Sequence, residues 1–332
     1  MKNNGVTVSA PGKLLLLGDH AVVYGFPCIV TAVNTRIVAT VKSIEESAFE
    51  LDAPDVNVHG YKKPMSEIGT GDVSKDAKFA EFTVKNYFKT FPFSGGISIH
   101  TQAQFSKSIG FGSSAATVVS ILAALVKLFH PSVSEKQLFL LAKKTVLDVQ
   151  HAGSGFDAAA ALYGGTILFE NHGEVVEPLS VQSMPLVVGY TGVKADTATI
   201  VGAVAQKREK EKVKVDRIFE AIGKLVEEAK DRMVEGDWER VGRLMDFNQE
   251  YLRDLGVSSE KLESLISAAK KAGAWGAKLS GAGGGDCMIA VASQDKRQNV
   301  VDAIVEAGGT VMDITTGEQG VRLETNNAEA KA

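Results

Sequence analysis

The chain has 332 residues, of which 45% are hydrophobic and 23% charged, a composition typical of a soluble globular enzyme with about two domains. Its formal net charge of −4 gives no basic surplus, which argues against a protein that binds nucleic acid. The longest apolar run, residues 115–126, is too short to span a bilayer.

The start of the chain and its cysteines predict a cytoplasmic protein. Residues 1–10 lack the basic start and the apolar core of a secretory signal peptide. Cys28 and Cys287 stand far apart in apolar surroundings, so they form neither a disulfide framework nor a metal-ligand spacing. We therefore expect a reduced protein in the cytoplasm, without membrane contact.

Two short strands, residues 6–10 and 13–17, are predicted on either side of Pro11-Gly12. The second strand ends at an acidic residue and a histidine in a turn, where polar site residues are frequent, so Asp19 and His20 are candidates. A solvated turn is the alternative. The next predicted elements are strands over 29–41, loops and a short hairpin over 44–71, a helix over 75–90 and a strand over 97–101.

A glycine loop, Gly110-Phe111-Gly112-Ser113-Ser114, precedes an apolar run with the length of a buried helix. The two glycines let the backbone turn tightly and approach a ligand, and a serine then supplies a hydroxyl at the helix start. The unpaired first amides and the helix dipole favour an anion there, so the loop predicts a phosphate site. A serine-capped helix after a glycine turn is the alternative.

A second helix is predicted over 134–149, opened by the capping-box pattern Ser134 to Gln137. It leads into a second glycine loop, residues 153–157, that ends at Asp157. This aspartate precedes an alanine-rich helical run whose small side chains pack closely. Asp157 is therefore either a site carboxylate or an aspartate stabilised by the dipole of its helix.

The second half of the chain is predicted to be mainly helical, and its segment 276–287 contains a third glycine loop at 281–285. Five of the twelve residues of this segment are glycine, which indicates a backbone that passes close to a ligand or to another segment. The predicted elements are a strand over 184–189 at a domain boundary, a polar loop over 191–197, helices over 199–235, 238–255 and 259–272, a strand over 288–292, a helix over 298–307, a strand over 311–314 and a frayed tail over 326–332.

Other nucleotide-binding patterns fit poorly. The first two glycine loops match G-x-G-x-x-A, but the first lacks the acidic residue that should close the following strand and the second follows a helix. A dinucleotide-dependent oxidoreductase is therefore disfavoured. The sequence contains no P-loop motif and no protein-kinase H-R-D or D-F-G motif.

Three stretches in order resemble the motifs of the GHMP kinases: residues 11–25, residues 110–116 and residues 278–285, which read K-L-S-G-A-G-G-G. The resemblance covers nearly the whole chain. It implies an α+β fold with two domains, a ribosomal S5 domain 2-like domain at 1–180 and a ferredoxin-like domain at 181–325, followed by a disordered tail at 326–332. The nucleotide would lie between the domains.

Within this superfamily, G-D-H-A-V-V-Y-G at 18–25 and L-M-D-F-N-Q at 244–249 resemble the mevalonate kinase family. The S-G-F-D sequence at 154–157 and G-G-D-C at 284–287 are more similar to the phosphomevalonate kinases. The resemblance implies ATP-dependent phosphorylation of the mevalonate 5-hydroxyl. The alternatives are phosphomevalonate or another small acceptor and, more remotely, a nucleotide-binding module without catalysis.

The resemblance also implies roles for single residues. Asp157 would be the catalytic base, with Lys13 beside it to stabilise developing charge. Ser114 would bind Mg²⁺, and because the family's glutamate ligand is missing from the preceding helix, Asp148 is the nearest carboxylate for the same ion. The implied ATP-binding residues are Ser108, Ile109, Gly110, Phe111, Gly112, Ser113, Ser114 and Ala115.

The implied partners of the protein are ATP and a small acceptor molecule, without nucleic acid or membrane. The resemblance also allows a homodimer. Lys13 is the only lysine or arginine between Asn3 and Thr35, and His151 is the only cationic candidate between Thr145 and Glu170; Lys107 and Lys194 are the other options. A phosphorylated acceptor would require more cations, so the sequence favours mevalonate. The implied substrate-binding residues are Lys13, Asp19, His20, Asp157, Thr197, Gly281 and Ala282.

Overall fold

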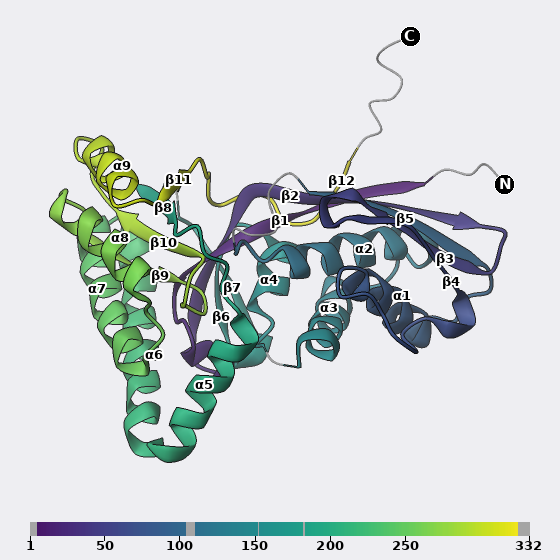
Figure 1. Cartoon of the computed structure of the whole chain (residues 1–332), viewed down its shortest axis with the longest axis horizontal. Helices are drawn as coiled ribbons and strands as arrows, with labels where there is room; N and C mark the ends of the chain where they lie inside the picture. The colour runs from purple at the N-terminus through teal and green to yellow at the C-terminus, as the bar shows by residue number, and fades with distance from the viewer. Residues whose placement is uncertain (1–4, 104–109, 152, 182, 325–332) are drawn as a thin grey trace, which may run out of the picture.

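The computed structural model describes residues 5–103, 110–151, 153–181 and 183–324 and contains two sheets, each with its own helices (Figure 1). The first sheet has the order β12-β1-β2-β5-β3-β4, and β6 and β7 extend it from β2. All of its pairings are antiparallel except that of β3 with β5. Its strands are β1 (Val6–Leu17), β2 (Cys28–Ile44), β3 (Ala48–Ala53), β4 (Val58–Pro64), β5 (Gly96–Ala103), β6 (Thr166–Glu170), β7 (Val175–Leu179) and β12 (Arg322–Leu323).

Four helices cover one face of this sheet (Figure 1): α1 (Lys78–Thr90), α2 (Ser113–Phe129), α3 (Glu135–Gln150) and α4 (Phe156–Tyr163). The apolar run of β1 is buried on both sides. Leu15 belongs to the core under these helices, whereas Leu14 and Leu16 pack in a cluster that includes residues of the second sheet. Consecutive leucines occur here because both faces of the strand exclude water.

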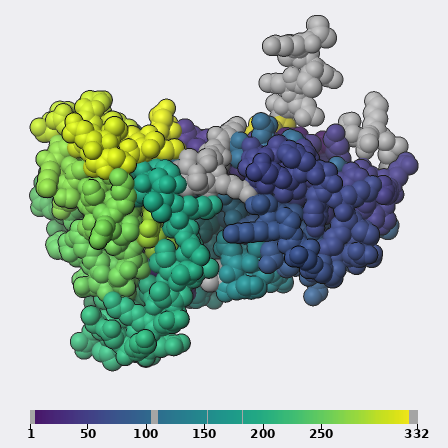
Figure 2. Space-filling view, viewed as in Figure 1, coloured from purple at the N-terminus to yellow at the C-terminus, as the bar shows by residue number. Residues whose placement is uncertain are grey.

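The second sheet is wholly antiparallel, with β11 (Thr310–Met312), β8 (Leu186–Tyr190), β10 (Cys287–Val291) and β9 (Gly276–Ser280) in that order. Figure 2 shows that α5 and α6 form an arm at the lower left of the molecule. The helices that accompany the second sheet are α5 (Thr197–Lys210), α6 (Lys212–Glu235), α7 (Trp238–Leu255), α8 (Glu260–Lys271) and α9 (Arg297–Glu306). The 3₁₀ turns of the chain include η1 (Ala21–Tyr24), η2 (Pro54–Val56), η3 (Met65–Glu67) and η5 (Asn171–Gly173).

Several local expectations need correction. The two strands predicted around Pro11-Gly12 are one strand, because a bulge between these residues absorbs the irregularity. The single helical region predicted over 199–235 is two helices, which separate at Glu211.

The capping box at Ser134 is confirmed. The Ser134 side chain accepts from the Gln137 backbone amide, and the Gln137 side chain accepts from the Ser134 backbone amide.

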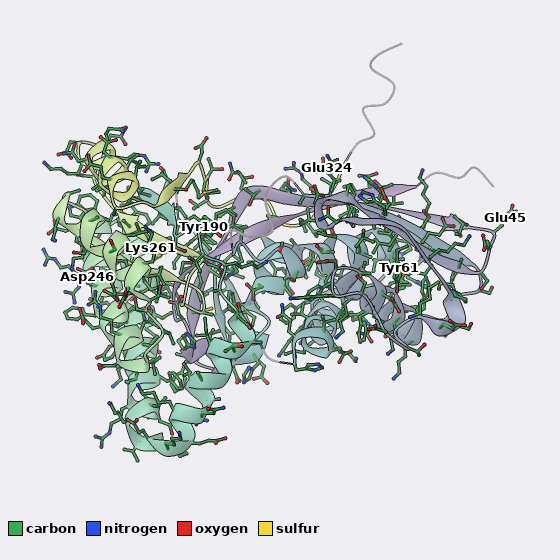
Figure 3. All side chains as sticks on the ribbon, in the orientation of Figure 1. Glu45, Tyr61, Tyr190, Asp246, Lys261 and Glu324 are labelled. Atoms are coloured by element: carbon green, nitrogen blue, oxygen red, sulfur yellow. The ribbon has the colours of Figure 1, made fainter. Side chains whose placement is uncertain are left out.

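The end of the described chain returns to the first sheet, which the sequence did not indicate. Strand β12 pairs with β1, and the Arg36 guanidinium donates to the carbonyls of Gln319 and Gly320, each at 2.7 Å. Figure 3 labels Glu324 here, far from Asp246 on α7. The last described residues of the predicted second domain therefore pack on the sheet of the first.

Two further expectations concern the chain as a whole. Cys28 and Cys287 are both buried and neither forms a disulfide. Among the helices of the described ranges, none is sufficiently long and apolar to cross a bilayer.

Candidate active site

The centre of the candidate site is a lysine–aspartate pair from two elements of the first domain. Lys13 lies on β1 and Asp157 in the first turn of α4, and Nζ is 3.1 Å from Oδ1. The Lys13 side chain is 9% exposed and that of Asp157 33%, so the carboxylate remains open on one side. The pair is thus both shielded and accessible to a ligand.

The first glycine loop lies directly against this pair. The Lys13 amide donates to the Phe111 carbonyl at 2.9 Å, and a Cβ on Gly112 would lie 3.1 Å from the Lys13 Cε and 3.4 Å from the Asp157 Oδ1. Gly112 has φ 73°, a conformation that favours glycine, and forms the N-cap of α2. The serine cap is therefore wrong: Ser113 and Ser114 follow the cap, and no described side chain caps the helix.

A substitution in this loop tests its role. Gly112→Val should weaken ATP binding by roughly 1–3 kcal/mol, about five- to 150-fold, because a branched side chain strains the positive φ and displaces Lys13. The measurement is the ATP dissociation constant by calorimetry. Gly236→Val is the matched control, since Gly236 has φ 75° with open space around it at the end of α6. A folded Gly112→Val protein with unchanged ATP affinity would contradict the role.

The Gly18 turn and the third glycine loop are joined by a buried network. Both Asp19 and Lys278 have side-chain exposures of 0%, with Nζ 2.6 Å from the Asp19 Oδ2. The other carboxylate oxygen accepts from the Gly281 amide at 2.7 Å, and the His20 Nε2 lies 2.9 Å from the Ala282 carbonyl oxygen. The structure thus brings together four of the seven implied substrate-binding residues, Asp19, His20, Gly281 and Ala282.

Burial sets the electrostatics of this network. It lowers the pKa of Lys278, and the negative charge of Asp19 opposes that shift. Burial also lowers the pKa of His20, so its neutral form is favoured and Nε2–H donates to the Ala282 carbonyl. The side chains of Asp19 and His20 are therefore occupied in holding the third loop.

Helix α7 supports the same turn and strand, a role that sequence reasoning missed. The Asn248 side chain accepts from the Gly18 amide at 3.3 Å, and the Gln249 side chain accepts from the Leu279 amide at 3.0 Å. Both are fully or almost fully buried. The N-Q pair in the 244–249 motif was the available signal, because buried amides require partners.

Some predicted site residues lie elsewhere. Asp148 pairs with Lys144 and accepts from the Asn86 amide at 2.9 Å, on the α1–α3 side of the domain. Thr197 is exposed at the start of α5, although that helix approaches the third loop where a Cβ on Gly284 would lie 2.5 Å from Ile200. Ser108 and Ile109, with Lys107, lie outside the described residues.

Two further residues near the site were missed. Asp286 lies against the first glycine loop, since a Cβ on Gly110 would be 2.7 Å from its Oδ2. Lys143 lies against the second loop, where a Cβ on Gly155 would be 3.0 Å from its side chain, and its ammonium donates to the His172 carbonyl at 2.7 Å. Asp286 stood in the G-G-D-C sequence; Lys143 gave no signal, because it comes from the middle of α3.

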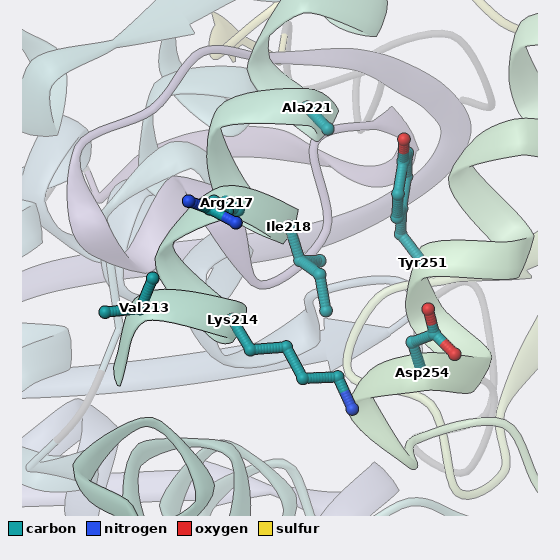
Figure 4. A pocket seen from close by; sticks show the side chains of 7 residues that line it. All are labelled: Val213, Lys214, Arg217, Ile218, Ala221, Tyr251 and Asp254. Carbon is teal, nitrogen blue, oxygen red and sulfur yellow. The ribbon is translucent and has the colours of Figure 1, made fainter. Parts of the chain in front are cut away.

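A cavity of about 180 Å³ opens beside the start of α2. Its polar lining includes Ser113, Ser114 and Lys194, and its apolar lining includes Ile37, Leu51 and Phe79. A larger cavity of about 500 Å³, between α6 and α7, is lined by none of the predicted site residues (Figure 4). The smaller cavity is thus the one continuous with the candidate phosphate loop.

Comparison with known proteins identifies the family. A model described as GHMP kinases N terminal domain matches residues 78–165, and one described as GHMP kinases C terminal matches residues 225–310. A mevalonate kinase from Thermococcus gammatolerans is 36% identical over 96% of this chain and 98% of its own length. The chain belongs to the GHMP kinases. A mevalonate kinase from Pyrococcus furiosus is 37% identical with the same coverage.

Solved GHMP kinases share the arrangement. The mevalonate kinase of L. major, solved in complex with R-mevalonate, superimposes with a TM-score of 0.76 at 27% identity, covering 94% of this chain and 96% of that one. The expected two-domain α+β fold is therefore confirmed. As a GHMP kinase, the protein is an ATP-dependent small-molecule kinase, and the oxidoreductase alternative is excluded.

Proposed function

We propose that this GHMP kinase phosphorylates the 5-hydroxyl of mevalonate with ATP. The observation that carries the proposal is the Lys13–Asp157 pair beside the glycine loop, in a chain that is 36% and 37% identical to two mevalonate kinases along nearly its full length. Asp157 accepts the proton of the acceptor hydroxyl, and Lys13 stabilises the charge that develops as the oxygen attacks. Phosphoryl transfer depends mainly on such positioning and charge neutralisation.

The first glycine loop holds the triphosphate in this proposal, from Ser108 to Ala115, with the amides at the start of α2 directed to its oxygens. The adenine base of ATP occupies the neighbouring cavity of about 180 Å³, where apolar side chains contact the faces of its ring. The nucleotide then lies with its terminal phosphate toward Lys13 and Asp157.

Mg²⁺ fits the chemistry of this loop. A hard cation takes oxygen ligands and keeps several waters, so the Ser114 hydroxyl and one carboxylate suffice as protein ligands. When bound, the ion neutralises phosphate charge. Asp148 suits this role poorly, because Lys144 and Asn86 already engage its carboxylate.

The acceptor follows from the cations near the site. Lys278 is committed to the buried Asp19, and Lys194 lines the cavity on the nucleotide side. Lys143 donates to a backbone carbonyl beside the second glycine loop. Among the described residues, Lys13 is therefore the cation that lies at the reacting groups. This favours mevalonate, which carries only a carboxylate, over phosphomevalonate, which carries about two further negative charges.

The acceptor-side residues divide into two roles in this proposal. Asp19 and His20 position the third glycine loop, and Gly281 and Ala282 present that loop to the acceptor, with Thr197 at its outer edge. We further propose that the enzyme acts in the cytoplasm on small molecules, with a nucleotide-binding domain at 1–180 and a second domain at 181–325. A homodimer is the assembly to test by light scattering.

The proposal is tested by ATP turnover with mevalonate, phosphomevalonate, galactose and homoserine in parallel, with ADP release as the readout. We expect turnover with mevalonate, and a ³¹P spectrum that shows a new phosphomonoester on its 5-oxygen. Turnover with galactose or homoserine but not with mevalonate would refute the proposal that mevalonate is the acceptor. Binding of ATP without turnover of any acceptor would indicate a module that has lost catalysis.

A further inference from the structure

Asp286 occupies an unusual position for a carboxylate. It ends the third glycine loop with φ 54°, and its main chain is fixed on both sides: its amide donates to the Val193 carbonyl at 2.7 Å and its carbonyl accepts from the Thr191 amide at 2.9 Å. A non-glycine residue at positive φ costs about 1 kcal/mol or more, so the surrounding contacts impose this conformation. The side chain is thereby held in one direction.

That direction leads to the first glycine loop. The Asp286 Oδ1 accepts from the Ala195 amide at 3.1 Å, and its Oδ2 faces Gly110, where a Cβ would lie only 2.7 Å away. One oxygen therefore fixes the 191–195 loop, whereas the other is presented to the loop proposed to hold the triphosphate. Gly110 is required there by its φ of 77° and by this close approach.

A carboxylate that faces phosphate groups is unfavourable unless a cation lies between them, because like charges repel strongly in a partly buried site. Burial raises the pKa of Asp286, and the positive charges of Lys13 and Lys194 lower it. Lys13 is already paired with Asp157 at 3.1 Å, and Lys194 lines the cavity proposed to hold the adenine, so in the proposed site both lysines have roles other than separating Asp286 from the phosphates. A divalent cation that touches both the carboxylate and the phosphates removes the repulsion.

We propose that Asp286, in the second domain, is the second protein ligand of the nucleotide-bound Mg²⁺, together with Ser114. This role rests on the proposed function. It gives the ion a carboxylate ligand although the carboxylate of Asp148 is engaged by Lys144 and Asn86. The position of the 191–195 loop is then linked to the metal, since Asp286 also accepts from the Ala195 amide.

The test uses Mn²⁺ in place of Mg²⁺ and ADP in place of ATP, so that no turnover is needed. Electron paramagnetic resonance measures the affinity of Mn²⁺ for the enzyme–ADP complex, and calorimetry measures ADP without metal. We expect Asp286→Asn to weaken Mn²⁺ binding at least tenfold while metal-free ADP binds as well as before or better. The side-chain oxygen of the substituted residue can still accept from the Ala195 amide. An unchanged midpoint of thermal unfolding will show that the fold is intact.

Two further variants sharpen the result. Asp286→Glu keeps a carboxylate and should hold Mn²⁺ more tightly than Asp286→Asn, whereas Asp148→Asn should match the wild type. The proposal is overturned if Asp286→Asn holds Mn²⁺ like the wild type, if metal-free ADP weakens in parallel, or if Asp148→Asn is the variant that loses the ion. Wild-type protein that binds no Mn²⁺–ADP would instead contradict the proposed function, and this role with it.

Discussion

Asp157→Asn should lower kcat by about 10²–10⁴-fold while ATP affinity stays nearly unchanged. The amide keeps the size of the carboxylate but cannot accept the proton of the acceptor hydroxyl. In the proposed function the nucleotide binds to the loop at Gly112 and in the cavity beside α2, which the substitution leaves in place. Steady-state kinetics give kcat, and calorimetry with ATP gives the dissociation constant.

The control for this variant is Asp216→Asn, which removes the charge of an aspartate that pairs with Arg208 and Lys212 at the α5–α6 junction. It should leave kcat within about twofold, because partly exposed ion pairs far from the site contribute little to stability or to catalysis. Turnover of Asp157→Asn at the wild-type rate would exclude Asp157 as the base.

Lys278→Met should lower the free energy of unfolding by about 3–5 kcal/mol, the usual cost of leaving one buried charge without its partner. Methionine approximates the volume of lysine, so the loss reports the missing charge more than a cavity. Asp19 would remain fully buried, with the Gly281 amide still at its Oδ1. Urea unfolding followed by the fluorescence of the two tryptophans, Trp238 and Trp275, is the measurement.

Arg243→Met is the matched comparison, since Arg243 pairs with Glu239 on the surface of α7 and both side chains are more than half exposed. It should cost less than about 1 kcal/mol. The double variant Lys278→Met with Asp19→Asn should recover part of the loss, because no charge is then buried alone. Equal losses for Lys278→Met and Arg243→Met would show that the buried pair does not hold the two domains together.

The sequence was most informative where chemistry and local structure coincide. The two glycines at 110 and 112, the lysine at the start of a leucine run and the aspartate after a glycine turn marked the segments that meet in the structure. The capping box at Ser134 likewise depends on neighbours three residues apart. Such features need no knowledge of distant contacts.

Contacts between distant segments were the part that local patterns could not supply. The sequence could not show that Asp19 pairs with Lys278, because the two residues are 259 positions apart. Lys143 reaches the second glycine loop only because α3 packs beside it, and β12 is too short to show a strand pattern. Asp148 was chosen by its nearness in sequence, although its side chain lies with Lys144 and Asn86.

The central claim is that mevalonate, and not its phosphorylated derivative, is the acceptor of this GHMP kinase. The most direct test is kcat/KM for mevalonate and for phosphomevalonate at one fixed concentration of ATP–Mg²⁺. We predict a preference for mevalonate of at least tenfold, about 1.4 kcal/mol of transition-state stabilisation. A preference of tenfold or more for phosphomevalonate would contradict the account, and would require a second cation, Lys107 or Lys194, at the acceptor.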